Sequence, residues 1–229
     1  AAVIAAVGVN AQDSKLTSSL GLATQHVHRG VTFNVAPVFE GKMQYGITNW
    51  LSVGADATMG LNAVAGYGNN FNLNVTATHD ELSLTIKDYY FLNGYTGGAN
   101  NYFDYGKATN HIVEASLKYA KEKYYGMAGL SVYQASENTK KGLYLEAGYD
   151  LLSNLTVCAG YVTEASAVNF REKGGFTHVG LINTRDWKVS ESWTSKVTTG
   201  IYINPTYKHV TEAAGIGSLP VNATVSLTF

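Results

Sequence analysis

The stretch Val221-Asn222-Ala223-Thr224-Val225-Ser226-Leu227-Thr228-Phe229 at the end of the chain decides the fold. Apolar and polar residues alternate along its whole length, which places all the apolar side chains on one face of a β-strand. The same alternation recurs upstream and predicts about twelve strands. The candidate strands cover 16–23, 35–45, 50–59, 71–78, 82–87, 113–119, 124–133, 142–151, 154–163, 175–183, 193–203 and 220–229.

The composition fits an all-β chain with two different environments. Of the 229 residues, 14% are charged, against ~25% in an ordinary protein, while there are 24 glycines, 16 tyrosines and three prolines. A disordered chain would be rich in charge and poor in aromatic residues. The net charge of −1 and the lack of a large basic cluster exclude a nucleic-acid partner on electrostatic grounds. The single cysteine, Cys158, excludes a disulfide framework and a cysteine-based zinc site.

The first residues differ from the rest of the chain. Residues 1–11 are apolar and end in Val9-Asn10-Ala11, a small-x-small tripeptide typical of the end of a secretory signal peptide. We therefore expect 1–11 to be the remnant of such a peptide and 12–229 to be one β-barrel domain. The alternative is a first apolar strand or a buried helix. The stretch is shorter than the ~20 residues of a transmembrane helix.

The connections between the candidate strands alternate in length. Short turns at 46–49, 79–81, 120–123 and 152–154 are interleaved with longer segments at 25–34, 59–70, 93–110, 134–141, 164–174 and 204–219, and 184–192 is an exception. Short turns at one end, long loops at the other and an even strand number predict a transmembrane, antiparallel, up-and-down β-barrel. Only a closed sheet leaves no bare strand edge in lipid. The alternative, a soluble barrel or sandwich, fits less well, because its outer face would carry more Lys and Glu.

Several parts of the sequence resemble known families. The apolar, alternating last strand with its terminal Phe229 is similar to the assembly signal of bacterial outer-membrane proteins, which implies that barrel-assembly machinery reads it. Residues 25–31, 36–46, 143–149 and 176–181 resemble TorF-type porins, whose chains begin with an aromatic-Arg-Gly turn followed by a proline and a strand. His28 stands where that pattern has an aromatic residue. The resemblance implies a barrel in the outer membrane of a Gram-negative bacterium, among its lipid and lipopolysaccharide, and a pore without a defined substrate.

The alternation also predicts which side chains line the lumen. Charged residues must point inward, because a Lys or Arg on the lipid face near mid-membrane costs roughly 2–4 kcal/mol. Asp88 breaks this rule, so either its strand bulges or it lies above the apolar band. The near balance of inward acids and bases, with Asp150 counted, indicates weak ion selectivity or pairing across strands. The predicted pore-lining residues are Glu40, Lys42, Trp50, Asp56, Lys87, Glu114, Lys118, Tyr144, Glu146 and Lys196.

Catalysis finds little support in the sequence. There is no Gly-x-Ser-x-Gly elbow to place a serine nucleophile near one of the six histidines. His26 and His28 have a spacing that could hold a metal, but without a carboxylate nearby in sequence we expect them to be exposed loop residues. Cys158 falls in the lumenal set as a small, inert filler. We expect no enzyme activity, no cofactor and no metal.

These observations favour a porin-like channel for passive diffusion of small polar solutes with weak selectivity. The alternative is a closed structural or accessory barrel of an envelope complex, with other envelope proteins or further copies of the chain as partners. Its contact surface would be the 93–110 loop with its aromatic residues Tyr95, Tyr102, Phe103 and Tyr105. The same loop could instead fold into the lumen and narrow it.

Overall fold

The computed structural model describes residues 15–34, 36–61, 69–92, 101–106, 109–135, 140–191, 194–210 and 220–228. Twelve of its strands close into one antiparallel barrel in the order β1-β14-β13-β12-β11-β10-β9-β8-β7-β6-β5-β4, with β4 returning to β1. This confirms the predicted antiparallel β-barrel of about twelve strands. The barrel strands are β1 (Leu16–Ala23), β4 (Val38–Gly46), β5 (Leu51–Gly60), β6 (Asn70–His79), β7 (Leu82–Phe91), β8 (His111–Lys121), β9 (Tyr124–Tyr133), β10 (Tyr144–Leu152), β11 (Leu155–Val162), β12 (Gly175–Lys188), β13 (Thr194–Ile203) and β14 (Val221–Thr228).

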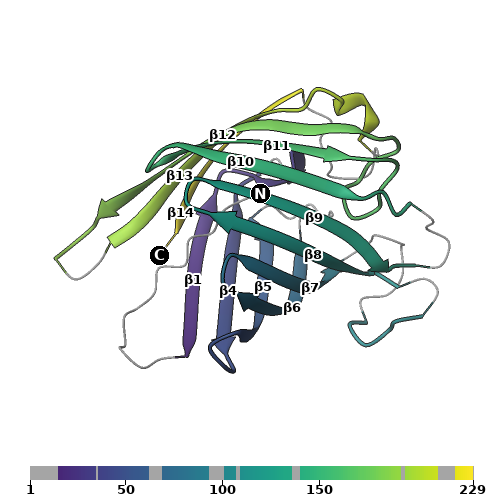
Figure 1. Ribbon diagram of the computed structural model, residues 1–229, viewed down its shortest axis with the longest axis horizontal. Helices are drawn as coiled ribbons and strands as arrows, with labels where there is room; N and C mark the ends of the chain where they lie inside the picture. The colour runs from purple at the N-terminus through teal and green to yellow at the C-terminus, as the bar shows by residue number, and fades with distance from the viewer. Residues whose placement is uncertain are drawn as a thin grey trace.

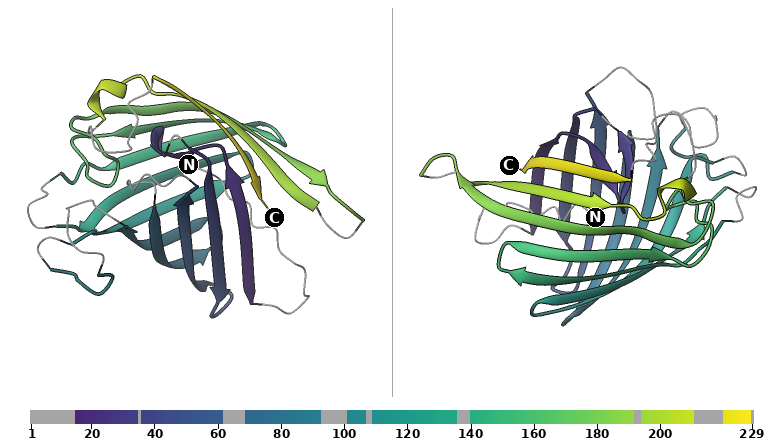
Figure 2. Two further views of the ribbon diagram at one scale, coloured as in Figure 1. Left: turned by 180° about the vertical axis from the view of Figure 1, so that it is seen from behind. Right: turned by 90° about the horizontal axis from the view of Figure 1, so that it is seen from above.

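The barrel is strongly twisted. β1, β4 and β5 run steeply in Figure 1, whereas β9–β12 cross the view at a wide angle to them, and Figure 2 shows the same two directions. A right-handed twist accumulates in any sheet of L-residues. The seam between β1 and β14 is short, with Gly21, Leu22 and Ala23 opposite Thr228, Leu227 and Ser226.

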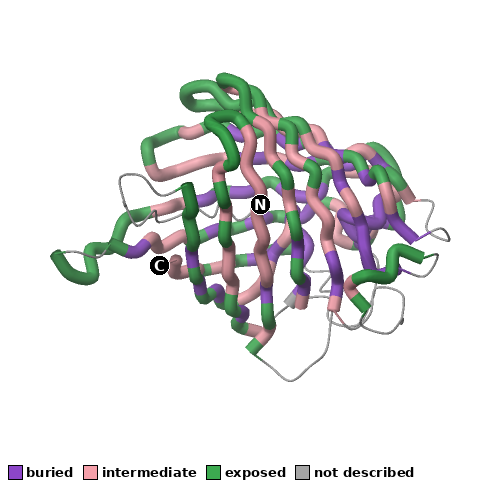
Figure 3. The backbone as a smooth tube through the Cα atoms, turned by 90° about the horizontal axis from the view of Figure 1, so that it is seen from below, coloured by how far each residue is buried: buried purple, intermediate pink, exposed green. Residues whose placement is uncertain are grey.

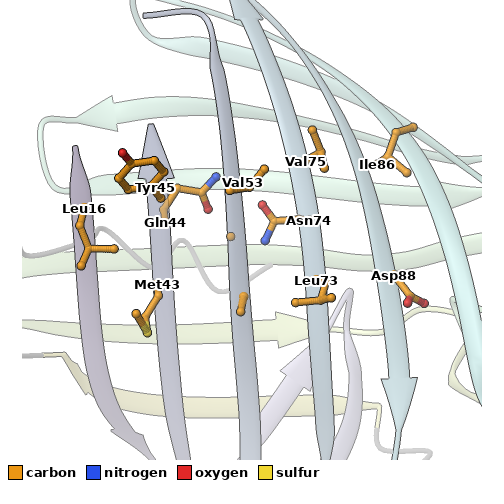
Figure 4. Close-up of a pocket in the computed structure, with 12 residues that line it drawn as sticks. Leu16, Met43, Gln44, Tyr45, Val53, Leu73, Asn74, Val75, Ile86 and Asp88 are labelled. Atoms are coloured by element: carbon orange, nitrogen blue, oxygen red, sulfur yellow. The ribbon is translucent and has the colours of Figure 1, made fainter. Parts of the chain in front are cut away.

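Alternation decides which side chains face outward, as the sequence predicts. Along β7, Leu82, Leu84 and Ile86 are exposed, while Ser83 and Thr85 between them are partly buried. Figure 3 shows the same exchange of exposed and buried positions along many strands. Across β1 and β4–β7 the outward side chains form an apolar groove of about 590 Å³, seen in Figure 4. Among its lining residues are Leu16, Met43, Tyr45, Val53, Leu73, Val75 and Ile86.

Several strand boundaries differ from the prediction; β7, for example, continues to Phe91 and not only to residue 87. The segment 184–192 is no long turn, because β12 continues to Lys188 and Thr184–Lys188 pair with Thr194–Thr198 of β13. The hairpin of β12 and β13 therefore projects beyond its neighbours, at the left of Figure 1. The predicted strand 35–45 begins later than expected: β4 starts at Val38, just after Pro37, which has no N–H to donate to a neighbouring strand.

The largest departure concerns the segment 25–34, which we expected as a long loop. It forms two further strands, β2 (His26–His28) and β3 (Val31–Asn34), which pair with each other in a separate two-stranded sheet. β1 and β4 meet directly beneath this hairpin, with Ala23 opposite Val38. The hairpin is therefore an insertion that the barrel does not need for its closure.

The helical content of the described residues is small. One 3-10 turn covers Tyr207–His209. Within the described ranges, no helix is long and apolar enough to cross a membrane.

Candidate functional site

The hairpin of β2 and β3, residues 26–34, fills the lumen at the long-loop end of the barrel. Its tip is the pair Arg29-Gly30, and both residues have positive φ, 51° and 76°. Two-residue hairpin turns with this backbone match the twist of the flanking strands. His28 and Val31 pair on either side of the tip. The turn therefore projects Arg29 away from the β1–β4 wall and across the barrel interior.

Arg29 ends in a buried site on the opposite wall. Its two terminal nitrogens each donate to one carboxylate oxygen of Glu114 on β8, both at 2.7 Å. Nη1 also donates to Oδ1 of Asn169 at 2.8 Å, and the guanidinium carbon lies 3.9 Å from the ring centroid of Tyr144. The Glu114 carboxylate raises the pKa of Arg29 above its usual range, against the opposing effect of burial. A two-point ion pair with an aromatic face beneath it is a specific arrangement for a guanidinium.

Gly30 seats the tip against β12. A Cβ atom at this position would lie 2.5 Å from the carbonyl oxygen of Thr177 and 2.6 Å from Cβ of His178, so no larger residue fits. The carbonyl oxygen of Gly30 accepts hydrogen bonds from the side-chain amides of Asn204 and Asn222, each at 3.2 Å. The tip is thereby bound to β12 and β14 as well as to β8.

Apolar contacts hold the two faces of the hairpin. Val31 and Phe33 pack in a buried cluster with Phe91, Ile112, Ala167, Val168, Phe170 and Val210. Val27 packs in a second cluster with Cys158, Ile182 and Tyr202. Full burial of each such side chain contributes roughly 1.5–3 kcal/mol. The hairpin is thus a packed plug, and its stability comes from apolar contact as well as from the ion pair.

The segment 163–174 covers the plug from the long-loop end. Ser166 and Arg171 pair through both backbone amides at 2.9 Å, which folds the segment back on itself. The Arg171 guanidinium is fully buried and donates to the carbonyl oxygens of Thr206 and Thr177 and to Oδ1 of Asn204, at 2.8, 3.0 and 3.1 Å. Burial lowers the pKa of Arg171 to about 10. These contacts attach the segment to β12 and to the residues after β13.

A cavity of about 270 Å³ remains between the plug and the wall formed by β4–β8. Asp56 and Lys87 form an ion pair of 2.9 Å across this wall, and Asn72 donates to the same carboxylate at 2.6 Å. From the plug side, Nδ1 of His26 lies 3.4 Å from the Glu40 carboxylate. The cavity therefore joins charged wall residues to the base of the plug.

Glu146 belongs to a second polar group in the interior. It accepts hydrogen bonds from the hydroxyls of Tyr144 and Tyr125, the latter at 2.8 Å, and Nε2 of His178 lies 3.7 Å away. Because Tyr144 also lies under Arg29, this group is continuous with the ion-pair site.

The structure brings several of the predicted pore-lining residues together and separates others. Glu40, Asp56, Lys87 and Glu114 line the cavity. Lys42 pairs in register with Asp56, Lys118 lies 4.9 Å from the Tyr125 ring centroid, and Lys196 is partly buried in β13. Trp50 does not lie in the wall: it precedes β5 in a turn and is 53% exposed. Strand alternation does not extend into a turn, so its predicted inward orientation has no basis there. Phe229 and Tyr95 lie outside the described residues.

Residues 101–106 of the 93–110 segment lie on the outer face rather than in the lumen. Asp88 follows Ile86 by two positions on the outward face of β7, and β7 has no register shift there. Its carboxylate accepts a hydrogen bond from the Tyr105 hydroxyl at 2.7 Å and lies 2.9 Å from Nδ1 of His111. Tyr102 covers Tyr90 and Phe71, with ring centroids at 5.1 and 5.6 Å. The residues 101–106 thus form a strap that encloses Asp88 without a bulge in the strand.

The two histidines of the hairpin are enclosed rather than exposed, contrary to expectation. The ring of His28 contacts those of Phe33 and Tyr89, with centroids at 5.7 and 5.9 Å. Burial, with Arg29 beside it, holds the pKa of His28 well below its usual value. No group of three or more potential metal ligands occurs within the described residues.

Sequence reasoning missed Arg29, Asn169 and Gly30 as site residues. A signal for the hairpin was present: Arg29-Gly30 stands between the alternating runs His26-Val27-His28 and Val31-Thr32-Phe33. An x-Gly pair between two short alternating runs is typical of a tight hairpin. Asn169 carried no comparable signal, because only tertiary folding brings it to Arg29.

Comparison with known proteins assigns this chain to no family. No family model and no curated protein matches the chain. Fourteen chains of solved structures match, among them "OmpT (in-vitro folded), an outer membrane protein of Vibrio cholerae". The match has 8% sequence identity and a TM-score of 0.30, and covers 94% of this chain and 98% of that one. The barrel architecture itself rests on the strand pairing described above.

Proposed function

We propose that this barrel spans a bacterial outer membrane and acts as a porin-like channel for small polar solutes, closed in this structure by the hairpin 26–34. The observation that carries the proposal is the position of the hairpin: a separate two-stranded insertion lies inside the lumen, directly against a polar cavity. Charged wall residues beside an open cavity are expected of a lumen that admits polar solutes, whereas an interior that served only as a hydrophobic core would be filled with apolar side chains.

The outer face supports the membrane location. Its strands present large apolar side chains over most of the barrel, among them Leu84, Ile86, Val132, Leu181 and Ile201, all exposed. Monomeric soluble proteins seldom expose continuous apolar patches of more than a few hundred Å². Polar and charged side chains of the same strands, among them Lys87 and Glu114, line the interior cavity, as such side chains do in membrane barrels, while Asp88 on the outer face is covered by the strap 101–106.

The plug is separable from the wall on structural grounds. β1 and β4 pair along their whole length without it, so removing the hairpin leaves the closed sheet intact. Its tip is held by an ion pair and hydrogen bonds, which water can replace once the apolar contacts open. Solutes would then pass where Arg29, Val31 and Phe33 now lie.

The experiment is single-channel recording of refolded protein in a planar bilayer. Because Ala23 and Val38 are direct partners, an Asn-Gly turn can replace residues 24–37. We expect rare openings for the full chain and long-lived openings for the shortened variant. A control variant, with the same turn in place of residues 61–69, retains the hairpin and should behave as the full chain does. A shortened barrel that is folded and still silent would refute the channel.

One observation favours a second role, as an accessory barrel that binds envelope proteins through its loops. Within the strap 101–106, Phe103 is 87% exposed, while Tyr102 and Tyr105 are held against the barrel. An exposed aromatic residue on an anchored segment suits a protein contact. Phe103→Ser should then weaken capture of an envelope partner without changing conductance.

A further inference from the structure

The place occupied by the Arg29 side chain has the composition of a binding site for an organic cation. It consists of the Glu114 carboxylate, the Asn169 amide oxygen and the face of Tyr144, at 2.7, 2.8 and 3.9 Å from the guanidinium group. All three supply negative charge or electron density, and Glu114 and Tyr144 belong to the barrel wall rather than to the plug. Arg29 is thus a ligand that the chain itself provides.

Withdrawal of the hairpin would change the charge balance of the lumen. The cavity wall carries three carboxylates, Glu40, Asp56 and Glu114, and one ammonium, that of Lys87. Asp56 keeps its partner Lys87, and Lys42 lies beside it in register. Glu114 loses its partner Arg29, and Glu40 loses its partner His26, because both partners leave with the hairpin. The near balance of charges in the closed barrel therefore includes the charge of the plug.

We propose that Glu114, Tyr144 and Asn169 form a site for guanidinium or ammonium groups, which Arg29 occupies in the closed barrel and a cationic solute occupies once the hairpin withdraws. The open lumen accordingly prefers organic cations to anions. The preference of the open lumen for cations rests on the proposed channel function, whereas the cation site does not. One experiment tests the site, and a second tests the preference.

The first experiment tests the site without any channel measurement. Arg29→Ala leaves Glu114 buried without a cation, so the yield of folded barrel, read as the heat-modifiable band on a gel, should fall. Guanidinium chloride at ~10 mM, far below the molar range in which it denatures proteins, should restore about half of the lost yield by binding the folded state. Sodium chloride at equal concentration should restore little. In Arg29→Ala/Glu114→Gln, guanidinium should have no effect. Equal effects of both salts, or rescue that persists in the double variant, would overturn the site.

The second experiment uses the barrel with residues 24–37 replaced by an Asn-Gly turn. Under a gradient of guanidinium chloride, its reversal potential should show a several-fold preference for the cation, and Glu114→Gln in this background should reduce it. Glu81→Gln, which alters an exposed turn residue paired with Lys121, is the matched control. Conductance without cation preference would refute the inference while leaving the channel in place. Absence of conductance would refute the channel, and the rescue experiment would still decide the site.

Discussion

Arg29 and Glu114, 85 positions apart in the chain, meet in a two-point ion pair inside the barrel, with both nitrogen–oxygen distances at 2.7 Å. Arg29 comes from the inserted hairpin and Glu114 from the wall. The pair therefore connects the plug to the barrel.

Glu114→Gln should destabilise the folded barrel strongly. The variant leaves a buried guanidinium without its counter-charge, and the loss of one partner of a buried pair typically costs about 3–5 kcal/mol. Unfolding in urea with the barrel in detergent measures the change. Glu81→Gln removes one partner of the exposed pair with Lys121 and should cost at most ~1 kcal/mol. Equal costs for the two variants would show that the buried pair contributes no special stability.

Gly30→Ala should displace the hairpin tip. Its φ of +76° is strained for alanine, and the added methyl group would meet backbone and side-chain atoms of β12 within about 2.6 Å. We expect more frequent channel openings and faster proteolysis within 24–37. Gly41→Ala, where the nearest atom would be 3.7 Å away, is the control with the same chemical change. A Gly30→Ala barrel with the behaviour of the Gly41→Ala barrel would contradict the described seat of the tip.

Acid should weaken the plug through His28. Its pKa in the folded barrel is held below the unfolded value of about 6.5 by burial and by Arg29. A histidine with a lowered pKa binds its proton more readily in the unfolded chain than in the folded barrel. Its titration therefore leaves the free energy of unfolding unchanged above about pH 6.5 and lowers it increasingly as the pH falls below that value. Unfolding free energies measured between pH 7.5 and 5, in the wild type and in His28→Phe, isolate this contribution. A pH dependence unchanged by the substitution would assign the effect to other groups.

Asp88 should determine whether the strap 101–106 stays attached. Asp88→Asn retains the size of the side chain but removes its negative charge. That charge faces His111, and the carboxylate that carries it accepts a hydrogen bond from the Tyr105 hydroxyl. Limited proteolysis of the intact barrel should then cut within 93–110 several times faster than in the wild type. Asp80→Asn, in an exposed turn, should leave the rate unchanged. Equal rates in all three proteins would mean that the aromatic contacts alone hold the strap.

A lysine scan of β7 tests the orientation of its side chains in the membrane. Ile86 faces outward and Thr85 faces the lumen. Ile86→Lys should lower the free energy of unfolding in lipid bilayers by roughly 2–4 kcal/mol, because its charge lies in hydrocarbon. Thr85→Lys should cost less, since its side chain reaches the lumenal cavity. The reverse order would place the apolar face inside and exclude the membrane location.

Local pattern determined most of the barrel in advance. Alternation along β7 and β14 fixes which side chains point to which face, because the side-chain period of a strand is two whatever lies around it. The number and class of the strands followed from that period and from the turns between them. The end of β12 at Lys188 was missed, since Thr184-Arg185-Asp186 is polar at every position and carries no alternation.

In the candidate site, too, the sequence predicts the orientation of the side chains but not their partners. The inward orientation of Glu114 and Glu146 could be predicted. On each strand the residues directly before and after the glutamate are apolar and face outward, so the glutamate faces inward. Their partners could not be predicted, since Arg29, Asn169 and His178 reach them from other segments of the chain.

The sequence by itself determined that this chain forms a barrel of alternating strands, because that information is local and is repeated in every strand. Only the tertiary structure decided that the hairpin 26–34 lies inside the lumen. The hairpin 26–34 is too short to be stable alone. It is held because the barrel wall supplies Glu114 for its tip and Phe91 and Ile112 for its apolar face, and the covering segment 163–174 supplies Phe170. Those partners are scattered along the chain, and folding alone brings them together.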